Sequence, residues 1–367
     1  MSESKNAGAE PEIPMSDISE FLKDGKMSET CTTIAQNFHE YGLIIVKDPR
    51  VDPAENEKFI DMMEKYFGQP EGLKLKDVRK EFHYQVGATP NNTEKARDHC
   101  SKFDALGEND KPITECPPGA DPKWRFFWRM GELPKETEFK QLNADPVYPE
   151  AFPEWPKTMN TWGSLILDTV STVSEMAALG FGLPQDSFTT RMKCGPHLLA
   201  PTGSDLQKHG AKGTVFASYH YDLNFMTIHG RSRYPGLFVW TRSGKKVRVK
   251  VPPGCLLIQA GAQFEYLTGG HVLAGYHEVV VADATLAAIE KAKAEKRSLW
   301  RVSSTLFSHI ASDNILEPIG KFSTPEALKK YPPTKAGHQV QKELDHIKLG
   351  VSDSAEQPAK KQKTDQE

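Results

Sequence analysis

The sequence predicts an α+β protein with a mainly β core, a double-stranded β-helix (jelly roll) flanked by amino-terminal helices. Two observations predict this class. Apolar residues recur at helical spacing in the first half of the chain, whereas after residue 186 short β-rich runs follow one another between turns. Regularly spaced strands of this kind are typical of a barrel or a double-sheet jelly roll.

Three amino-terminal segments have helical character. In residues 28–42, Ile34, Phe38 and Tyr41 follow a serine cap and Gly42 supplies a stop. Residues 52–68 begin near a proline and end at a glycine, and residues 162–177 carry apolar side chains at the i, i+3, i+4, i+7 positions. The run LIIVKD between the first two helices predicts a buried strand.

The later half contains the predicted core strands. They are TVFASYHYDL, GLFVW, KKVRVKV, CLLIQAG, AGYHEVVV and WRVSSTLFSHI, with turns at TRSGKK and YLTGGH. In KKVRVKV, valines alternate with lysine and arginine, which indicates a half-buried strand. The predicted organisation is a disordered segment at 1–12, a mixed helical and strand region at 13–185, a jelly-roll core at 186–322, a helical segment at 323–349 and a disordered tail at 350–367.

Composition narrows the class of partner. The formal net charge of the 367 residues is -3, so no overall field favours nucleic acid or a membrane surface, and a small-molecule substrate is the better expectation. We expect a monomer, although nothing in the sequence sets the oligomeric state. The amino terminus lacks the apolar stretch of a secretory signal, and no run is long enough to span a bilayer.

The five cysteines are widely spaced and form no C-x-x-C pair, so we expect neither a disulfide framework nor a thiolate zinc site. This usage predicts a reducing, cytoplasmic location. A small basic cluster in the tail, Lys360, Lys361 and Lys363, leaves nuclear import open.

A candidate metal site lies in SYHYDLNFMTIHG, residues 218–230. Side chains two apart on a strand share a face, so His220 and Asp222 can converge, whereas His229 sits at an odd offset and should face away. Two imidazoles and one carboxylate on one face of an ion form a non-haem iron site with open positions. For the third ligand we favour His277, at the start of a strand, over His271, beside a glycine turn.

Several blocks of the chain, in the same order, resemble the isopenicillin N synthase-like iron(II)/2-oxoglutarate-dependent oxygenases. YHYDLNFMTI, PPGCLLIQAG, TGGHVLAGYH and RVSSTLFSHI are similar to that family's core motifs, and IPMSDIS and HEYGLIIVKDPRV to its opening. The resemblance covers about residues 13–320, and it implies that the jelly-roll core at 186–322 is the oxygenase core. It places His220, Asp222 and His277 at the iron-ligand positions.

The resemblance also places Arg301 and Ser303 where the family holds the distal carboxylate of 2-oxoglutarate. A guanidinium matches a carboxylate in geometry, and a hydroxyl two positions along the same strand face can complete the clamp. Arg297 is a weaker alternative, with no such hydroxyl. The implied cofactors are Fe(II), 2-oxoglutarate and O2, and the implied reaction oxidises a small organic molecule with release of succinate and CO2.

The chain departs from the family pattern at several places. Gln259, Ala262 and Glu278 replace the family's asparagine, aspartate and arginine, and RMKCGP (191–196) lacks a tyrosine often found nearby. Twenty-four positions rather than about ten separate His277 from Arg301, and the insert between them predicts a surface helix. Two alternatives therefore remain: an iron oxidase of the same fold that uses no 2-oxoglutarate, and a catalytically inert binding relative. The aromatic run KWRFFWRM is assigned to the core (Trp124, Phe126, Phe127 and Trp128), not to the site.

Overall fold

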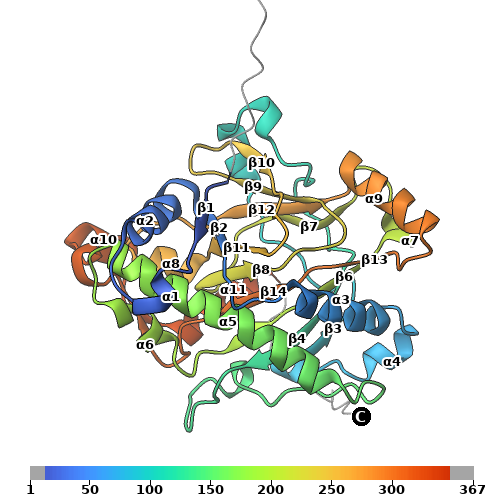
Figure 1. Cartoon of the computed structure of the whole chain (residues 1–367), viewed down its shortest axis with the longest axis horizontal. Helices are drawn as coiled ribbons and strands as arrows, with labels where there is room; N and C mark the ends of the chain where they lie inside the picture. Colours follow the sequence, from blue (N-terminus) through green and yellow to red (C-terminus); the bar gives the residue numbers. More distant parts are fainter. Residues whose placement is uncertain (1–12, 348–367) are drawn as a thin grey trace, which may run out of the picture.

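Two β-sheets and a layer of helices make up the molecule in the computed structural model, which describes residues 13–347 (Figure 1). The predicted disordered ends, 1–12 and 350–367, and the tail lysines lie outside these residues. The helices within them are α1 (Phe21–Asp24), α2 (Glu29–Tyr41), α3 (Pro53–Phe67), α4 (Glu71–Leu75), α5 (Trp155–Gly180), α6 (Thr189–Met192), α7 (Leu206–His209), α8 (Ala262–Leu267), α9 (Asp283–Ala294), α10 (Pro325–Lys330) and α11 (Ala336–His346). None of the described helices is both long enough and apolar enough to cross a membrane.

The amino-terminal helices form where the spacing of apolar residues predicts them. Helix α2 ends at Gly42, whose φ of 69° lies in the left-handed region that glycine adopts without strain. Its amide donates to the Phe38 carbonyl oxygen, which closes the last turn. Helix α5 is longer at both ends than predicted and packs against α2, α3 and strands of the larger sheet, so it covers the outer face of that sheet (Figure 1).

The larger sheet runs in the order β1-β2-β11-β8-β14-β5-β4-β6-β13, with β3 attached to β4. Its strands are β1 (Met15–Asp17), β2 (Leu43–Lys47), β3 (Gly87–Thr89), β4 (Trp124–Met130), β5 (His197–Leu199), β6 (Thr202–Asp205), β8 (Met226–His229), β11 (Cys255–Ala260), β13 (Trp300–Val302) and β14 (Thr305–Ser308). The first four come from the region before residue 185, so that region and the predicted core share one sheet.

The smaller sheet runs in the order β10-β9-β12-β7. It consists of β10 (Lys246–Arg248), β9 (Leu237–Trp240), β12 (Tyr276–Val280) and β7 (Val215–His220), and a separate hairpin pairs β15 (Ile315–Leu316) with β16 (Thr334–Lys335). Strand β10 is shorter than the alternating valines predicted, but Val249 and Val251 still pack on the apolar cluster beneath this sheet. Residues 277 and 220 are direct partners in the β12–β7 ladder.

The insert between His277 and Arg301 is a helix, as predicted. Helix α9 connects β12 of the smaller sheet to β13 of the larger one, and its buried side chains Ile289 and Ala292 pack in a small cluster with Leu206. The added length therefore forms a separate surface feature (Figure 1). Lengthening a connection is inexpensive, about 0.6 kcal/mol for each doubling, and β13 keeps its pairing with β6.

Candidate metal and cosubstrate site

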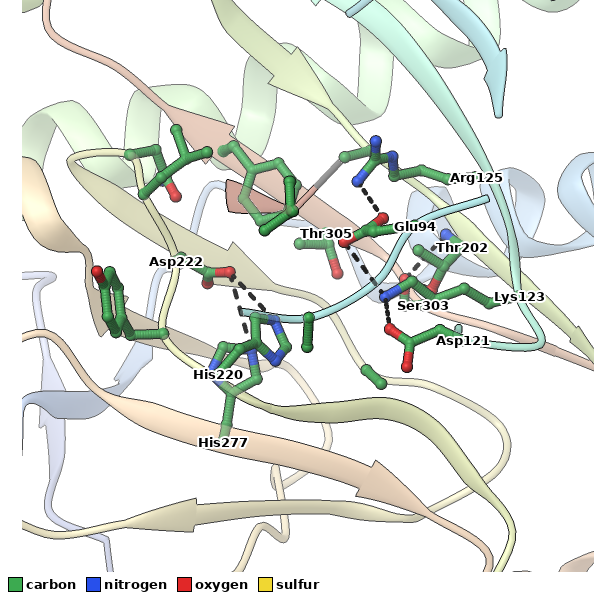
Figure 2. Close-up of a pocket in the computed structure, with 18 of the residues that line it drawn as sticks. Glu94, Asp121, Lys123, Arg125, Thr202, His220, Asp222, His277, Ser303 and Thr305 are labelled. Atoms are coloured by element: carbon green, nitrogen blue, oxygen red, sulfur yellow. Dashed lines mark hydrogen bonds and ion pairs between the residues drawn. The ribbon is translucent and has the colours of Figure 1, made fainter. Parts of the chain in front are cut away.

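A cavity of about 160 Å³ has walls from both sheets. His220 and His277 come from strands β7 and β12 of the smaller sheet, and Arg301 comes from β13 of the larger one. Figure 2 shows the two histidines with Asp222 on one side of this space and a group of charged side chains on the other. The site residues predicted from distant parts of the sequence therefore line one cavity.

The three predicted metal ligands converge on one point. The Asp222 Oδ1 atom lies 3.7 Å from His220 Nε2 and 3.8 Å from His277 Nε2, and one ligand atom from each residue lies within 4.8 Å of the others. The two Oδ1–Nε2 separations are too long for hydrogen bonds. They are shorter than twice the roughly 2.1 Å that a divalent metal keeps from such atoms, so a single ion can touch both partners of each pair.

Neighbouring groups orient each of these side chains. His220 Nδ1 lies 2.6 Å from the Ser218 carbonyl oxygen and His277 Nδ1 lies 3.3 Å from that of Gly275. A carbonyl oxygen only accepts, so Nδ1 of each ring carries the proton and Nε2 keeps its lone pair. The Thr227 hydroxyl donates to Asp222 Oδ2 at 2.6 Å, which leaves Oδ1 directed at the two Nε2 atoms.

The electrostatics of the group favour metal-binding protonation states. Burial, together with the nearby His277, lowers the pKa of His220 to about 3, so its imidazole is neutral near pH 7. Burial would raise the pKa of Asp222, but the two histidines and the Thr227 hydroxyl outweigh it and lower that pKa. A neutral imidazole and an ionised carboxylate are the forms that bind metal.

The structure corrects the geometric argument for two of these residues. Strand β7 ends at His220, so Asp222 reaches the site from the loop that follows and not from the same strand. His229 does not face away: it lines the same cavity, where its ring nitrogens lie 3.0 Å from Thr305 Oγ1 and 3.0 Å from Gln259 Oε1. His229 belongs to β8 in the other sheet, so its sequence offset from residue 220 does not set its direction.

Arg301 also lines the cavity, and only 6 % of its surface is exposed. Within residues 13–347 no acid forms an ion pair with its guanidinium, and Nε has no hydrogen-bond partner. Burial alone lowers its pKa to about 10, so it remains charged at neutral pH. Ser303 faces the same space, with its hydroxyl 2.7 Å from that of Thr202.

The two less favoured candidates from the sequence, His271 and Arg297, do not line the cavity. His271 stacks on His39 of α2, with ring centroids 4.1 Å apart. Arg297 forms an exposed ion pair with Glu295 at 2.7 Å. His309 is buried and lines the cavity, a place that no pattern in the sequence predicts.

The cavity also contains a buried charge network that the sequence does not predict. Arg125 Nη1 lies 2.6 Å from Glu94, and Lys123 Nζ lies 2.8 Å from Asp121 and 3.5 Å from Glu94 (Figure 2). Asp121 in turn accepts hydrogen bonds from the Ser218 amide and hydroxyl, two positions before His220. The acids and the lysine come from the irregular region between β3 and β4, where no periodic pattern could have located them.

Of the predicted core aromatics, Phe127 lines the cavity, whereas Trp124, Phe126 and Trp128 pack in the main apolar core. All seven residues of β4 are buried because both faces of this strand are covered. The run KWRFFWRM therefore lacks the alternation that would have separated Phe127 from its neighbours.

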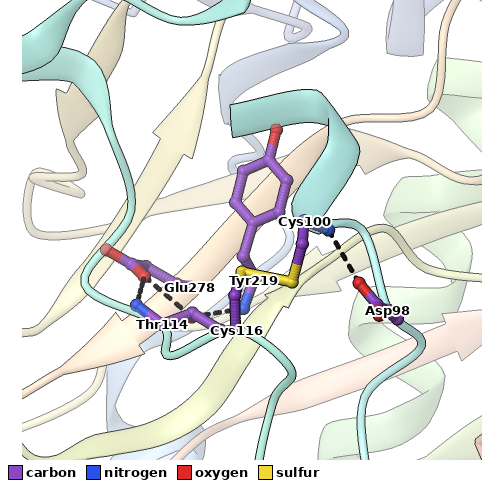
Figure 3. The surroundings of a disulfide bond; sticks show 6 residues. All are labelled: Asp98, Cys100, Thr114, Cys116, Tyr219 and Glu278. Atoms are coloured by element: carbon purple, nitrogen blue, oxygen red, sulfur yellow. Dashed lines mark hydrogen bonds between the residues drawn. A yellow bond between two sulfur atoms is a disulfide. The ribbon is translucent and has the colours of Figure 1, made fainter. Parts of the chain in front are cut away.

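The structure contains one disulfide, although the cysteine spacing predicted no disulfide framework. Cys100 and Cys116 are bonded across a loop that begins in the short 3-10 helix η2 (Cys100–Ala105) (Figure 3). Between them, Thr114 donates to Glu278 and accepts from the Tyr219 amide, which attaches the loop to strands β12 and β7. Sequence spacing showed no paired motif because the loop itself brings the two cysteines together.

We expect thiol labelling to detect this bond. In unfolded protein without reductant, three cysteines should react (Cys31, Cys194 and Cys255), and all five after reduction. Reduction should lower the free energy of unfolding by about 3 kcal/mol. Without the cross-link the unfolded chain regains the conformational entropy of a loop of this size, which stabilises the unfolded state by that amount. Mass spectrometry after alkylation and a denaturant melt measure both effects. A Cys100→Ser/Cys116→Ser double variant should label three times under both conditions, and five labels on unreduced wild type would show that the bond is absent.

Comparison with known proteins agrees with this architecture. Residues 13–151 match the family model described as the amino-terminal domain of non-haem dioxygenases in morphine synthesis. A solved protein assigned to the 2OG-Fe(II) oxygenase family, from Caulobacter crescentus, is 25 % identical, with a TM-score of 0.67 over 91 % of this chain and 99 % of that one. The resemblance to the isopenicillin N synthase-like oxygenases is confirmed.

Other solved proteins match this chain over a similar share of its length and with similar TM-scores, but with lower sequence identity. A full-length protein from Neurospora crassa, solved in complex with alpha-KG, is 19 % identical with a TM-score of 0.69 over 91 % of this chain and 96 % of its own. JOX2, solved with 2OG, Fe and JA, is 18 % identical with a TM-score of 0.64 over 95 % of this chain and 92 % of its own. The predicted jelly-roll α+β fold class is thus confirmed. No curated protein matches the chain.

Proposed function

We propose that this protein is an iron(II)- and 2-oxoglutarate-dependent dioxygenase that oxidises a small organic molecule, most simply by hydroxylation. In that reaction one oxygen atom of O2 enters the product and the other enters succinate, with loss of CO2. The neighbouring structures solved with alpha-KG or 2OG support the cosubstrate. The observation that carries the proposal for this chain is Arg301, a buried guanidinium in the cavity without an acidic partner among the described residues.

An unpaired buried charge is costly, by several kcal/mol after relaxation. A fold that keeps one at the wall of a cavity therefore indicates an anionic ligand, and a fork of N–H donors matches a carboxylate. The Ser303 and Thr202 hydroxyls lie beside each other at the same wall and can donate to the same group. These three residues would bind the distal carboxylate of 2-oxoglutarate.

The residues present also fit the metal. His220, Asp222 and His277 offer two lone-pair nitrogens and one carboxylate oxygen directed at a common point, the donor set of non-haem iron(II) sites. When bound, iron(II) supplies a redox-active centre that couples oxidative decarboxylation of 2-oxoglutarate to oxidation of the substrate. The alternative metal-free interpretation, a hydrogen-bonded cluster, is disfavoured because the Nε2–Oδ1 separations of 3.7 and 3.8 Å exceed hydrogen-bond length.

The protein's own contribution is orientation and exclusion of water. The Ser218 and Gly275 carbonyls hold the two rings in one tautomer, and Thr227 holds the carboxylate. Apolar side chains such as Phe127 and Leu198 form much of the remaining wall, which keeps the reacting groups away from bulk solvent. His229 stays neutral, because burial lowers its pKa to about 4, and so adds no charge beside Asp222.

An anaerobic titration tests the proposal. Iron(II) followed by 2-oxoglutarate should produce the weak visible absorption of the chelate, and succinate should form in step with substrate consumption once O2 is admitted. A silent spectrum from correctly folded protein would support an inert binding protein. Turnover of a substrate without succinate would instead support an oxidase that does not use 2-oxoglutarate.

A further inference from the structure

The charges around the cavity balance. Its wall carries four acidic and four basic side chains from the described part of the chain, namely Glu94, Asp121, Asp222 and Glu343 against Arg97, Lys123, Arg125 and Arg301. Arg125 and Lys123 lower the pKa of Glu94 to about 2 despite its burial, and Asp121 and Glu94 likewise outweigh burial and raise the pKa of Lys123. These two shifts keep Glu94 and Lys123 ionised at neutral pH. Burial and the neighbouring Glu94 raise the pKa of Asp121, while Lys123 and the Ser218 hydroxyl act against that rise.

Six of the eight charges are already paired with one another. Arg125 lies 2.6 Å from Glu94, and Lys123 lies 2.8 Å from Asp121. The third pair joins Arg97 Nη1 to Glu343 at 3.4 Å, and Arg97 also approaches the Tyr221 hydroxyl. Each pair holds one positive and one negative charge, so together they present no net charge to a ligand.

The two remaining charges are those assigned to the metal and the cosubstrate. Within residues 13–347, Asp222 has no lysine or arginine partner and faces the two histidines, and Arg301 has no acid partner. An iron(II) ion and a 2-oxoglutarate dianion carry opposite charges of equal size. Binding both therefore leaves the cavity as balanced as before.

From this balance we propose that the substrate, the molecule that the enzyme oxidises, carries no charge. This inference rests on the proposed function. An anionic substrate would have to take a cation from one of the three pairs and leave a carboxylate unpaired, and a cationic substrate would do the reverse. Leaving one member of a buried pair without its partner is strongly unfavourable, and the Lys123–Asp121 and Arg125–Glu94 pairs are both largely buried. The uncharged part of the wall includes the apolar side chains of Leu223, Leu344 and Ile347, which pack in one cluster, and Leu344 directly follows Glu343 in the sequence.

The Arg97–Glu343 pair offers a way to change this balance without altering the candidate metal and cosubstrate residues. Its separation is the longest of the three, and Arg97 is the most exposed cation of the network, with 38 % of its side-chain surface exposed against 16 % for Glu343. Arg97 precedes η2, and Glu343 lies on α11. Replacing either residue with glutamine leaves the other as a single free charge at the cavity wall.

The test compares wild type with Glu343→Gln, Arg97→Gln and the double variant. All four are first loaded anaerobically with iron(II) and 2-oxoglutarate, and the chelate absorption is recorded. Binding is then measured by the shift in melting temperature and by calorimetry, without O2, for sets of small amides, carboxylates and amines built on the same carbon skeletons.

Wild type should bind the amides best within each set. Glu343→Gln should gain about tenfold in affinity for carboxylates and Arg97→Gln about tenfold for amines, while the double variant should again favour amides. A wild-type preference for carboxylates or amines, or no preference in any set, overturns the inference. Absence of the chelate band in wild type would be a different result, since it rejects the proposed function on which the inference rests.

Discussion

Replacing His277 with alanine should reduce iron(II) affinity more than about 100-fold and abolish succinate formation. Removing a residue that only hydrogen-bonds to a metal ligand already lowers metal affinity or activity about 10–100-fold. Removing His277, a predicted ligand itself, should have a larger effect. Its Nε2 atom lies 3.8 Å from Asp222 Oδ1, and both atoms face the point on which the three predicted ligands converge. Metal content after equilibrium dialysis and succinate formation at saturating 2-oxoglutarate measure the two effects.

His271→Ala is the matched control. This histidine is six positions away in the same block of sequence, but it stacks on His39 and lies outside the cavity. Its removal should leave iron affinity and succinate formation unchanged. Unaltered metal binding in the His277→Ala variant, with the fold intact by circular dichroism, would remove that residue from the site; loss of metal in His271→Ala would show that the alternative choice was right.

The predictable parts of this molecule are those with a local physical signature. Helix α2 could be placed from three apolar residues and a terminal glycine, and α9 from its composition, because helical periodicity and end signals are properties of short segments. His277 could be preferred over His271 because it opens an apolar strand. In each case the information lies within about fifteen residues.

Features that depend on how distant segments meet could not be predicted in the same way. The direction of His229 is set by its strand lying in the opposite sheet, and Asp222 enters from a loop whose path no alternation pattern describes. Glu94 and Lys123 reach the cavity from an irregular region that has no period to read. The bond between Cys100 and Cys116 likewise depends on the return of a loop.

The irregular region nevertheless has a clear physical role. Its Asp121 side chain accepts from the Ser218 amide on β7, a strand at the edge of the smaller sheet, and its Thr114 binds both Glu278 and the Tyr219 amide. A strand at a sheet edge has unpaired backbone groups, which this loop covers. The same segment thus protects the strand that carries His220 and supplies charged residues to the cavity.

Replacing Arg301 with alanine should raise the 2-oxoglutarate concentration needed for half-maximal rate by about 30-fold or more, corresponding to the roughly 2–5 kcal/mol expected when one member of a buried charged pair is removed. Succinate formation at varied 2-oxoglutarate gives the KM, and anaerobic titration of the chelate band gives the Kd independently of turnover. Arg301→Lys should recover only part of the affinity, since an ammonium keeps the charge but loses the two-pronged match to a carboxylate.

The Arg301→Ala substitution should weaken 2-oxoglutarate binding without lowering the stability of the ligand-free protein. Because the Arg301 guanidinium has no acidic partner among residues 13–347, its removal breaks no ion pair there and relieves a buried charge. We therefore expect the ligand-free Arg301→Ala variant to melt at or above the wild-type temperature, and added 2-oxoglutarate to stabilise wild type but not the variant. Arg297→Ala is the control, since this exposed arginine pairs with Glu295 outside the cavity, and it should keep the wild-type KM. Equal stabilisation of wild type and Arg301→Ala by 2-oxoglutarate would place the dicarboxylate elsewhere, whereas a large drop in the melting temperature of the ligand-free variant would show that the guanidinium has a structural partner.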